Sequence, residues 1–173
     1  MDPDLELSTH VGEELRRRGL KLVTAESCTG GLIGDWITNV PGSSDYYLGG
    51  VVAYSYEAKM RLLGVPAGLL AQYGAVSEET VKEMARGARA LLSAEFPPQQ
   101  IVALSVSGIA GPGGGLPGKP VGLAWIGLDG PGLWRGYRCV WPGERVDNKR
   151  SSAREALRLL LAYLHGTPRG EAG

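Results

Sequence analysis

The sequence predicts a single α/β domain with three layers, in which helices cover both faces of a mixed, mostly parallel sheet. Short apolar runs alternate along the chain with segments whose apolar residues recur at helical spacing. Two apolar runs near the C-terminal end are joined by a short turn, which adds antiparallel pairing. The 173 residues show neither an internal repeat nor an interdomain linker. We therefore expect one domain over residues 1–165, followed by a disordered tail over 166–173.

Helical spacing and stop signals define the elements of the first half. Apolar residues three or four positions apart mark the helices, and Gly19 and Gly64 follow two of them as stop signals. The strands are short apolar runs between turn residues. The predicted elements are a helix over 5–18, a strand over 22–24, a helix over 32–37, a loop over 40–44, a strand over 48–54 and a short helix over 57–63.

Capping residues and turns define the second half. Ser77 is placed to cap a helix, with Glu78 and Glu79 at its positive end. Pro97 and Pro98 stop the following linker from continuing as helix. Residues 130–132 read as the turn of an antiparallel hairpin. The predicted elements are a helix over 78–92, a strand over 101–106, a glycine-rich loop over 108–118, strands over 121–128 and 134–141, and a last helix over 151–164.

Composition excludes several classes of partner. Eighteen basic and eighteen acidic residues cancel, and no long run of one sign occurs, so charge gives no reason to expect direct nucleic-acid binding or a membrane partner. No stretch approaches the roughly 18 apolar residues that span a bilayer. The acidic N-terminus lacks a signal-peptide pattern, so we expect a cytoplasmic protein. With only Cys28 and Cys139, a disulfide framework is excluded and both thiols are expected to be reduced.

Histidine is scarce, which narrows the chemistry. His10 and His165 lie near the two ends, each on a predicted helix. A Ser-His-Asp hydrolase or a histidine-rich metal site would have to use these two, and surface histidine is the better interpretation for both. If a lysine serves as the base instead, the candidates are Lys21, Lys59, Lys82, Lys119 and Lys149.

Two loops lie where ligands gather in open α/β sheets, at the ends of strands. The loop over 24–31 places Ser27, Cys28 and Thr29 between a buried strand and the start of a helix. A nucleophile there gains from the helix dipole and from backbone N–H groups that bind an oxyanion or a phosphate. The alternative is that Ser27 or Thr29 merely caps the helix, and this segment alone favours capping.

The second loop, 107–118, contains an incomplete phosphate-binding motif. Gly113 to Lys119 spells G-x-x-x-x-G-K, but Pro120 and a strand follow where the ATPase motif requires Ser or Thr and a helix. We reject the ATPase interpretation. A glycine-rich loop that lets the backbone approach a ligand and a simple flexible connection both remain open.

A third segment, 54–59, ends in Lys59. A lysine withdrawn from water loses basicity and can act as a general base near neutral pH. Serine activated by lysine is an alternative to serine activated by histidine. Taken alone, however, this segment predicts that Lys59 is an exposed helical lysine.

Six blocks of sequence together resemble the CinA C-terminal domain family, and the match extends from about Leu5 to Leu164. In this chain they read Thr24-Ala25-Glu26-Ser27-Cys28-Thr29-Gly30-Gly31, Pro41-Gly42-Ser43-Ser44, Tyr54-Ser55-Tyr56-Glu57-Ala58-Lys59, Gly74-Ala75-Val76-Ser77, Ser107-Gly108-Ile109-Ala110-Gly111-Pro112 and Lys119-Pro120-Val121-Gly122.

The resemblance implies a nicotinamide-nucleotide amidase. Such an enzyme converts nicotinamide mononucleotide and water to nicotinate mononucleotide and ammonia, in pyridine-nucleotide recycling. The resemblance also implies a homo-oligomer that needs no metal or organic cofactor. Longer relatives carry a further N-terminal domain that acts on nucleotide pyrophosphates and is linked by name to competence and DNA damage. We do not expect that domain's activity here.

The resemblance also assigns roles to residues. Ser27 is the expected nucleophile, Lys59 its base, and Tyr54 a neighbour of the substrate. Tyr56 stands where relatives often have asparagine. The remaining candidates are expected to contact the oxyanion or the phosphate: Thr29, Gly30, Gly31, Ser107, Gly108, Gly111 and, near the phosphate, Arg145.

Two other functional hypotheses remain open. The chain could be a non-catalytic nucleotide-binding module associated with competence or the DNA-damage response, with residues 24–31 only cradling a phosphate. It could also be an amidase that uses Cys28 as the nucleophile, which requires a thiol whose pKa is lowered.

Overall fold

A computed structural model describes residues 2–166. One five-stranded sheet forms its centre, with the strand order β2-β1-β3-β4-β5. β1 pairs in parallel with β2 and β3, whereas β4 pairs antiparallel with β3 and β5. Four strands therefore run in one direction and β4 runs in the other, which confirms the predicted mixed sheet. The strands are β1 (Lys21–Glu26), β2 (Tyr47–Val52), β3 (Ile101–Gly108), β4 (Leu123–Gly130) and β5 (Leu133–Val140).

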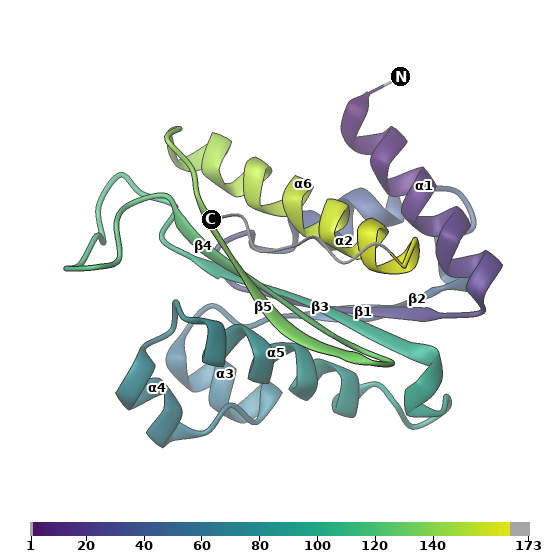
Figure 1. The fold of residues 1–173 in the computed structure, drawn as a ribbon, viewed down its shortest axis with the longest axis horizontal. Helices are drawn as coiled ribbons and strands as arrows, with labels where there is room; N and C mark the ends of the chain where they lie inside the picture. The colour runs from purple at the N-terminus through teal and green to yellow at the C-terminus, as the bar shows by residue number, and fades with distance from the viewer. Residues whose placement is uncertain (1, 167–173) are drawn as a thin grey trace.

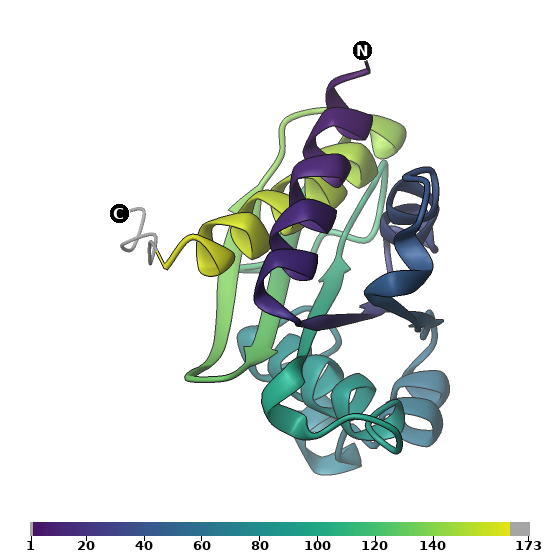
Figure 2. The same ribbon diagram turned by 90° about the vertical axis from the view of Figure 1, so that its right-hand side faces the viewer.

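Helices cover both faces of this sheet, as Figures 1 and 2 show from two sides. One face carries α1 (Pro3–Arg18), α2 (Leu32–Thr38) and α6 (Arg145–Leu164). The other face carries α3 (Tyr56–Leu63), α4 (Ala67–Tyr73) and α5 (Glu78–Leu91). Two short 3-10 helices, Ser43–Asp45 and Pro98–Gln100, complete the described structure. The predicted three-layer α/β/α architecture is confirmed.

The sheet separates two hydrophobic cores because successive side chains of a strand point to opposite faces. On β3, Val102, Leu104 and Val106 join the core under α1, α2 and α6. Ile101 and Ala103 join the core under α3, α4 and α5. A central strand buried on both faces has no solvent-facing side, which explains why β3 is mostly apolar and why its Ser105 is buried as well.

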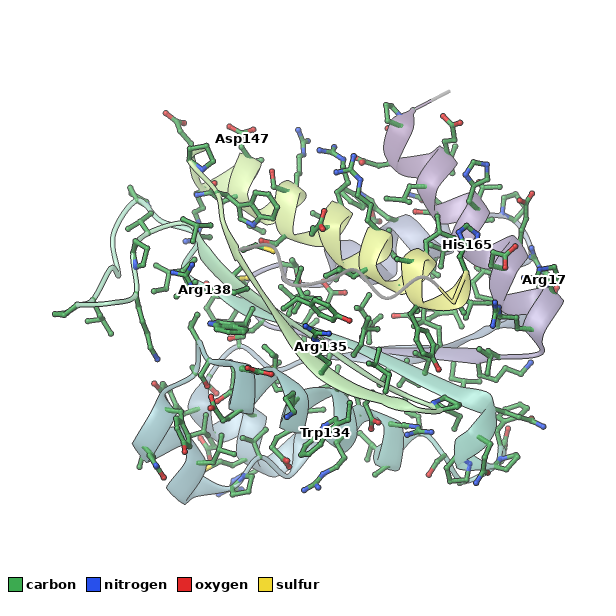
Figure 3. All side chains as sticks on the ribbon, viewed as in Figure 1. Arg17, Trp134, Arg135, Arg138, Asp147 and His165 are labelled. Carbon is green, nitrogen blue, oxygen red and sulfur yellow. The ribbon has the colours of Figure 1, made fainter. Side chains whose placement is uncertain are left out.

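β5 is an edge strand that is anchored to α5 by an aromatic side chain. Trp134 projects from β5 towards α5 (Figure 3), and its indole N–H donates to the carbonyl of Lys82 at 3.1 Å. The Lys82 ammonium also lies 4.1 Å from the centre of the Trp134 ring, within cation–π range. These contacts fix β5, the second strand of the predicted hairpin, against α5. The end of β5 in turn sets where α6 begins.

Most element boundaries differ from the prediction by one or two residues, the start of the last helix differs by six, and α4 lies in a segment for which we predicted no helix. The last helix begins at Arg145 rather than at residue 151, because its first turns carry polar side chains that contact neighbouring loops and so show no apolar periodicity. β4 begins at Leu123 rather than at residue 121, because Gly122 has a φ of +88° that a strand does not accept. Of the predicted tail, only Gly166 lies within the described residues. No helix between residues 2 and 166 has the length and apolarity needed to cross a membrane.

A close approach of backbones joins α5 to α3. A Cβ atom added to Gly87 would lie 1.8 Å from the carbonyl oxygen of Leu63, a backbone atom that cannot rotate away. We therefore expect Gly87→Ala to lower the free energy of unfolding by about 3 kcal/mol, measured by urea denaturation. Gly68→Ala is the matched control, because nothing lies within 4 Å of a Cβ at that position in α4. It should leave stability unchanged or raise it by up to about 1 kcal/mol. Equal effects of the two substitutions would contradict this account of the packing.

Candidate active site

The candidate site lies where neighbouring strands send the chain to opposite faces of the sheet. After β1 the chain turns into α2 on one face, and after β2 it turns into α3 on the other. In open α/β sheets ligands bind at such a point, outside the carboxyl ends of the strands. β3 and β5 run in the same direction as β1, so the loop after β3 and the start of α6 reach the same edge.

The structure brings Ser27 and Lys59 together at this point. Lys59 Nζ lies 2.8 Å from Ser27 Oγ, and both side chains are buried, with exposed fractions of 1% for Lys59 and 7% for Ser27. Ser27 follows β1 directly, and Lys59 lies in α3, whose N-cap is Ser55. Ser27 does not cap α2. The N-cap residue of that helix is Gly31, and no side-chain hydrogen bond caps the helix. The interpretation of Ser27 or Thr29 as a helix cap and the interpretation of Lys59 as an exposed lysine are both wrong.

Burial changes the acid–base chemistry of Lys59. Because removal from water disfavours the charged form, the pKa of Lys59 falls from 10.5 to about 8, although the nearby Cys28 thiol opposes the fall. Near neutral pH a measurable fraction of this lysine is thus the neutral amine. That is the form that accepts a proton.

The surroundings of Lys59 suit both of its protonation states. Its ammonium donates to Ser27 Oγ and to the carbonyls of Ala53 at 2.8 Å and Tyr54 at 3.2 Å, which accounts for its three hydrogens. The neutral amine keeps two hydrogens, enough for the two carbonyls, and turns its lone pair to the serine. The Ser27 hydroxyl can then donate to Nζ. The two carbonyls therefore hold the amine in the orientation that a base for Ser27 needs.

Glu26 fills the positive end of α2, a role that we did not predict from the sequence. Its buried carboxylate accepts hydrogen bonds from the backbone N–H of Gly31 at 3.0 Å, Ile33 at 3.1 Å and Gly34 at 3.0 Å. This arrangement satisfies the amides that begin the helix. A glutamate that ends a buried strand four residues before a glycine pair is the sequence signal that could have indicated it.

The remaining N–H groups of the loop after Ser27 differ in their availability. The N–H of Gly30 donates to the carbonyl of Ser27 at 3.1 Å. Between residues 2 and 166, no backbone carbonyl accepts a hydrogen bond from the N–H of Cys28 or Thr29. Cys28 and Thr29 are therefore the residues of this loop that still offer a donor, whereas Gly30 and Gly31 already use theirs. The Thr29 hydroxyl is buried and has no hydrogen-bond partner within the described chain.

Arg145 joins two other predicted site residues, Gly111 and Tyr54. Its Nη1 donates to the carbonyl of Gly111 at 2.7 Å and its Nη2 to the hydroxyl of Tyr54 at 2.9 Å. Tyr54 itself is largely exposed, while its carbonyl binds Lys59. The guanidinium thus ties the loop after β3 to the loop after β2, next to the Ser27–Lys59 pair.

Asn148, one turn further along α6, was not predicted and fixes this helix to the same loops. Its side-chain amide donates to the carbonyls of Ala110 at 3.0 Å and Gly143 at 2.8 Å. Ser107 and Gly108, by contrast, belong to β3 and pair with β4. The buried Ser107 hydroxyl donates to the carbonyl of Ala75 at 2.7 Å, on the connection between α4 and α5, rather than to Ser27 or Lys59.

Cys28 lacks the environment of a reactive thiol. Its side chain packs in the core under α1, α2 and α6, and burial raises its pKa from 9.0 to about 11, against the opposing charges of Lys59 and Lys149. A nucleophilic cysteine needs the opposite shift. The geometry therefore favours Ser27 over Cys28. Among residues 2–166, no group of three or more His, Cys, Asp or Glu side chains could hold a metal ion.

Comparison with known proteins identifies the family to which this chain belongs. The model of the CinA C-terminal domain matches residues 4–164. The chain belongs to the CinA C-terminal domain family. This membership confirms the resemblance seen in the sequence, and the solved structures agree with it. A CinA superfamily protein from Klebsiella pneumoniae has a TM-score of 0.88 and 35% identity, with 95% of this chain and 99% of that chain covered.

Relatives in the CinA family fall into two lengths. A Pseudomonas putida protein named nicotinamide-nucleotide amidohydrolase PncC is 46% identical over 93% of this chain and 97% of its own length. A putative competence-damage inducible protein from Halothermothrix orenii is 44% identical over 94% of this chain but only 38% of its own length. The chain therefore spans less than half of the longer relatives and nearly the whole of the shorter one.

Proposed function

We propose that this chain is an amidohydrolase that converts nicotinamide mononucleotide and water to nicotinate mononucleotide and ammonia, with Ser27 as nucleophile and Lys59 as its base. The observation that carries the proposal is the buried Ser27–Lys59 pair, with 2.8 Å between Oγ and Nζ. The substrate is suggested by the name of the Pseudomonas putida relative, which this chain matches over nearly the full length of both.

In the first half of the reaction, the neutral amine of Lys59 takes the proton of the Ser27 hydroxyl as Oγ attacks the carboxamide carbon. A tetrahedral intermediate forms, with negative charge on the former carbonyl oxygen. The N–H groups of Cys28 and Thr29 are the donors of the loop that can stabilise this charge. Lys59 then gives its proton to the amide nitrogen, the carbon–nitrogen bond breaks, and ammonia leaves an ester on Ser27.

In the second half, water hydrolyses the ester. Lys59, again neutral, takes a proton from the attacking water, and a second tetrahedral intermediate forms at the same carbon. The bond to Oγ breaks, and the proton on Lys59 returns to Ser27. Nicotinate mononucleotide leaves, and the serine and lysine are restored. No metal or organic cofactor enters any of these steps.

Tyr54 and Arg145 complete the proposed site on its open side. Their mutual hydrogen bond places a phenol and a guanidinium beside the loop that carries Gly111. We assign Tyr54 to the positioning of the nucleotide and Arg145 to its phosphate. Cys28 takes no part as a nucleophile in this scheme.

The direct test is ammonia release from nicotinamide mononucleotide by the purified protein. A coupled ammonia assay and chromatographic identification of nicotinate mononucleotide should show the two products in equal amounts, with turnover of order 1 per second or faster. Nicotinamide as a product instead would mean cleavage of the glycosidic bond and would exclude an amidase. Binding of the nucleotide without release of any product would support the non-catalytic nucleotide-binding module associated with competence or the DNA-damage response.

A further inference from the structure

We infer that Lys149, acting together with Arg145, binds the phosphate of the mononucleotide and so makes the site select phosphorylated substrates over the corresponding nucleosides. This inference rests on the proposed function and adds a specificity-determining residue to it. Lys149 was only one of five candidate lysines in the sequence, and nothing in its immediate neighbours distinguishes it.

The position of Lys149 places its charge over the loop that carries Ser27. A Cβ atom added to Gly30 would lie 3.8 Å from Lys149 Nζ, so the ammonium lies above the glycine backbone. Gly30 is the residue whose N–H donates to the carbonyl of Ser27. In agreement with this closeness, Lys149 is one of the two cations whose charge opposes the rise that burial causes in the pKa of Cys28.

Arg145 and Lys149 present two positive charges on one side of α6. Residues four positions apart on a helix are neighbours on its surface, and these two lie in the first turns of α6. Arg145 uses two of its five N–H donors in hydrogen bonds to Gly111 and Tyr54, and these bonds orient the guanidinium. The other donors remain available to a phosphate.

No carboxylate between residues 2 and 166 forms an ion pair with either cation. Asp147, the acidic residue of the first turn of α6, is exposed and points away from the sheet (Figure 3). The pair therefore carries charge that nothing in the described chain neutralises.

The nearby helix N-terminus cannot serve as the anion site instead. The amides of Gly31, Ile33 and Gly34 at the start of α2 are already held by the carboxylate of Glu26. A phosphate brought there would meet a negative charge rather than free N–H groups. Because that anion site is filled from within, the phosphate of a substrate bound at Ser27 needs positive partners elsewhere, and α6 supplies them.

The chemistry of the pair fits a terminal phosphate. A phosphate monoester carries nearly two negative charges at neutral pH and three acceptor oxygens. A guanidinium and an ammonium together match that charge. A nucleoside offers no such group and would leave both cations without a partner.

The test compares a phosphorylated and an unphosphorylated ligand on Lys149→Met and Lys149→Arg. Ser27→Ala is used as the background for calorimetric binding, so that neither ligand is consumed. For Lys149→Met we expect the dissociation constant of nicotinamide mononucleotide to rise at least about tenfold, and its ratio to that of nicotinamide riboside to rise with it. Lys149→Arg should recover most of the loss. Arg150→Met removes one charge from the same helix at an exposed position and serves as the matched control.

Steady-state kinetics of ammonia release give a second measurement, on variants that keep Ser27. Lys149→Met should raise KM for nicotinamide mononucleotide more than it lowers kcat, because the phosphate is remote from the reacting carbon. The inference is overturned if Lys149→Met weakens mononucleotide and riboside equally, or weakens neither, or if Arg150→Met has the same effect.

The result also separates this inference from the proposed function. A wild-type protein that binds the mononucleotide without releasing ammonia removes the amidase proposal, and the binding ratios still decide the role of Lys149. A protein that does not bind the mononucleotide at all overturns both.

Discussion

Ser27→Ala is expected to reduce ammonia release from nicotinamide mononucleotide by about 10⁴-fold or more while leaving the protein folded. The hydroxyl is the only group of the buried pair that can form the ester, and removal of a nucleophile from such a unit costs nearly the whole of its rate enhancement. The Ser27 side chain caps no helix, so its loss should change stability little. The measurement is kcat/KM for the variant beside the wild type, with circular dichroism and urea unfolding as the test of folding.

Cys28→Ala is the matched control for this experiment. It deletes the side chain next to the proposed nucleophile, and burial keeps that thiol protonated by raising its pKa to about 11. The variant should keep activity within about threefold of the wild type and lose about 1 kcal/mol of stability, because the thiol packs in the core. An inactive but folded Cys28→Ala beside an active Ser27→Ala would reverse the assignment of the nucleophile.

Lys59→Met is expected to lower kcat/KM by about 10³-fold or more, and the wild-type rate should depend on pH in a way that identifies the base. Lys59 is active as the neutral amine, so kcat/KM should rise as pH rises through its pKa of about 8. From pH 6 to pH 8 the neutral fraction grows about fiftyfold, after which the rate should level off. A rate that is flat over this range would contradict the role of Lys59 as the base.

The stability of the protein gives an independent check on the same group. The pKa of Lys59 is lower in the folded chain than in the unfolded one, so the unfolded chain binds more protons between about pH 8 and pH 10.5. Stability should therefore rise with pH across that window, by on the order of 2–3 kcal/mol relative to Lys59→Met, which lacks the group. Lys59→Arg retains a cation that cannot give up its proton, so it should be inactive even where it folds.

Much of the fold follows from local sequence patterns, and the errors in the predicted boundaries have local causes. Apolar periodicity, the Ser77 cap and the hairpin turn indicated most of the elements and their types, but not α4, because these signals reflect interactions within a few residues of each other. The start of α6 was missed because Arg145 and Asn148 face loops rather than a core, and polar residues in such positions carry no periodicity. The start of β4 was misplaced because the positive φ of Gly122 prevents the strand from starting before Leu123, and the polarity of the neighbouring residues does not reveal this.

The candidate site was predicted in part. The block resemblance named Ser27, Lys59, Tyr54 and Arg145, all of which the fold gathers at one edge of the sheet. Ser107 and Gly108 lie in β3, with the Ser107 hydroxyl bonded elsewhere. The sequence did not predict roles for Glu26 and Lys149, because each role depends on a contact formed by folding. Glu26 accepts hydrogen bonds from backbone amides, and Lys149 lies over a loop more than a hundred residues away in sequence.

The sequence by itself determined the order and kind of most elements, the lack of a metal or histidine signature and, through its six blocks, the family. Those properties depend on residue type and on spacing along the chain, which a sequence contains. Only the tertiary structure decided that Lys59 is buried against Ser27 instead of lying on an exposed helix face. It also decided that the positive end of α2 is filled by Glu26 and that Arg145 and Lys149 of α6 form no ion pair among residues 2–166. Burial and charge pairing depend on which segments meet in space, and the sheet order that brings β1, β2 and the start of α6 to one edge is not written in any one of them.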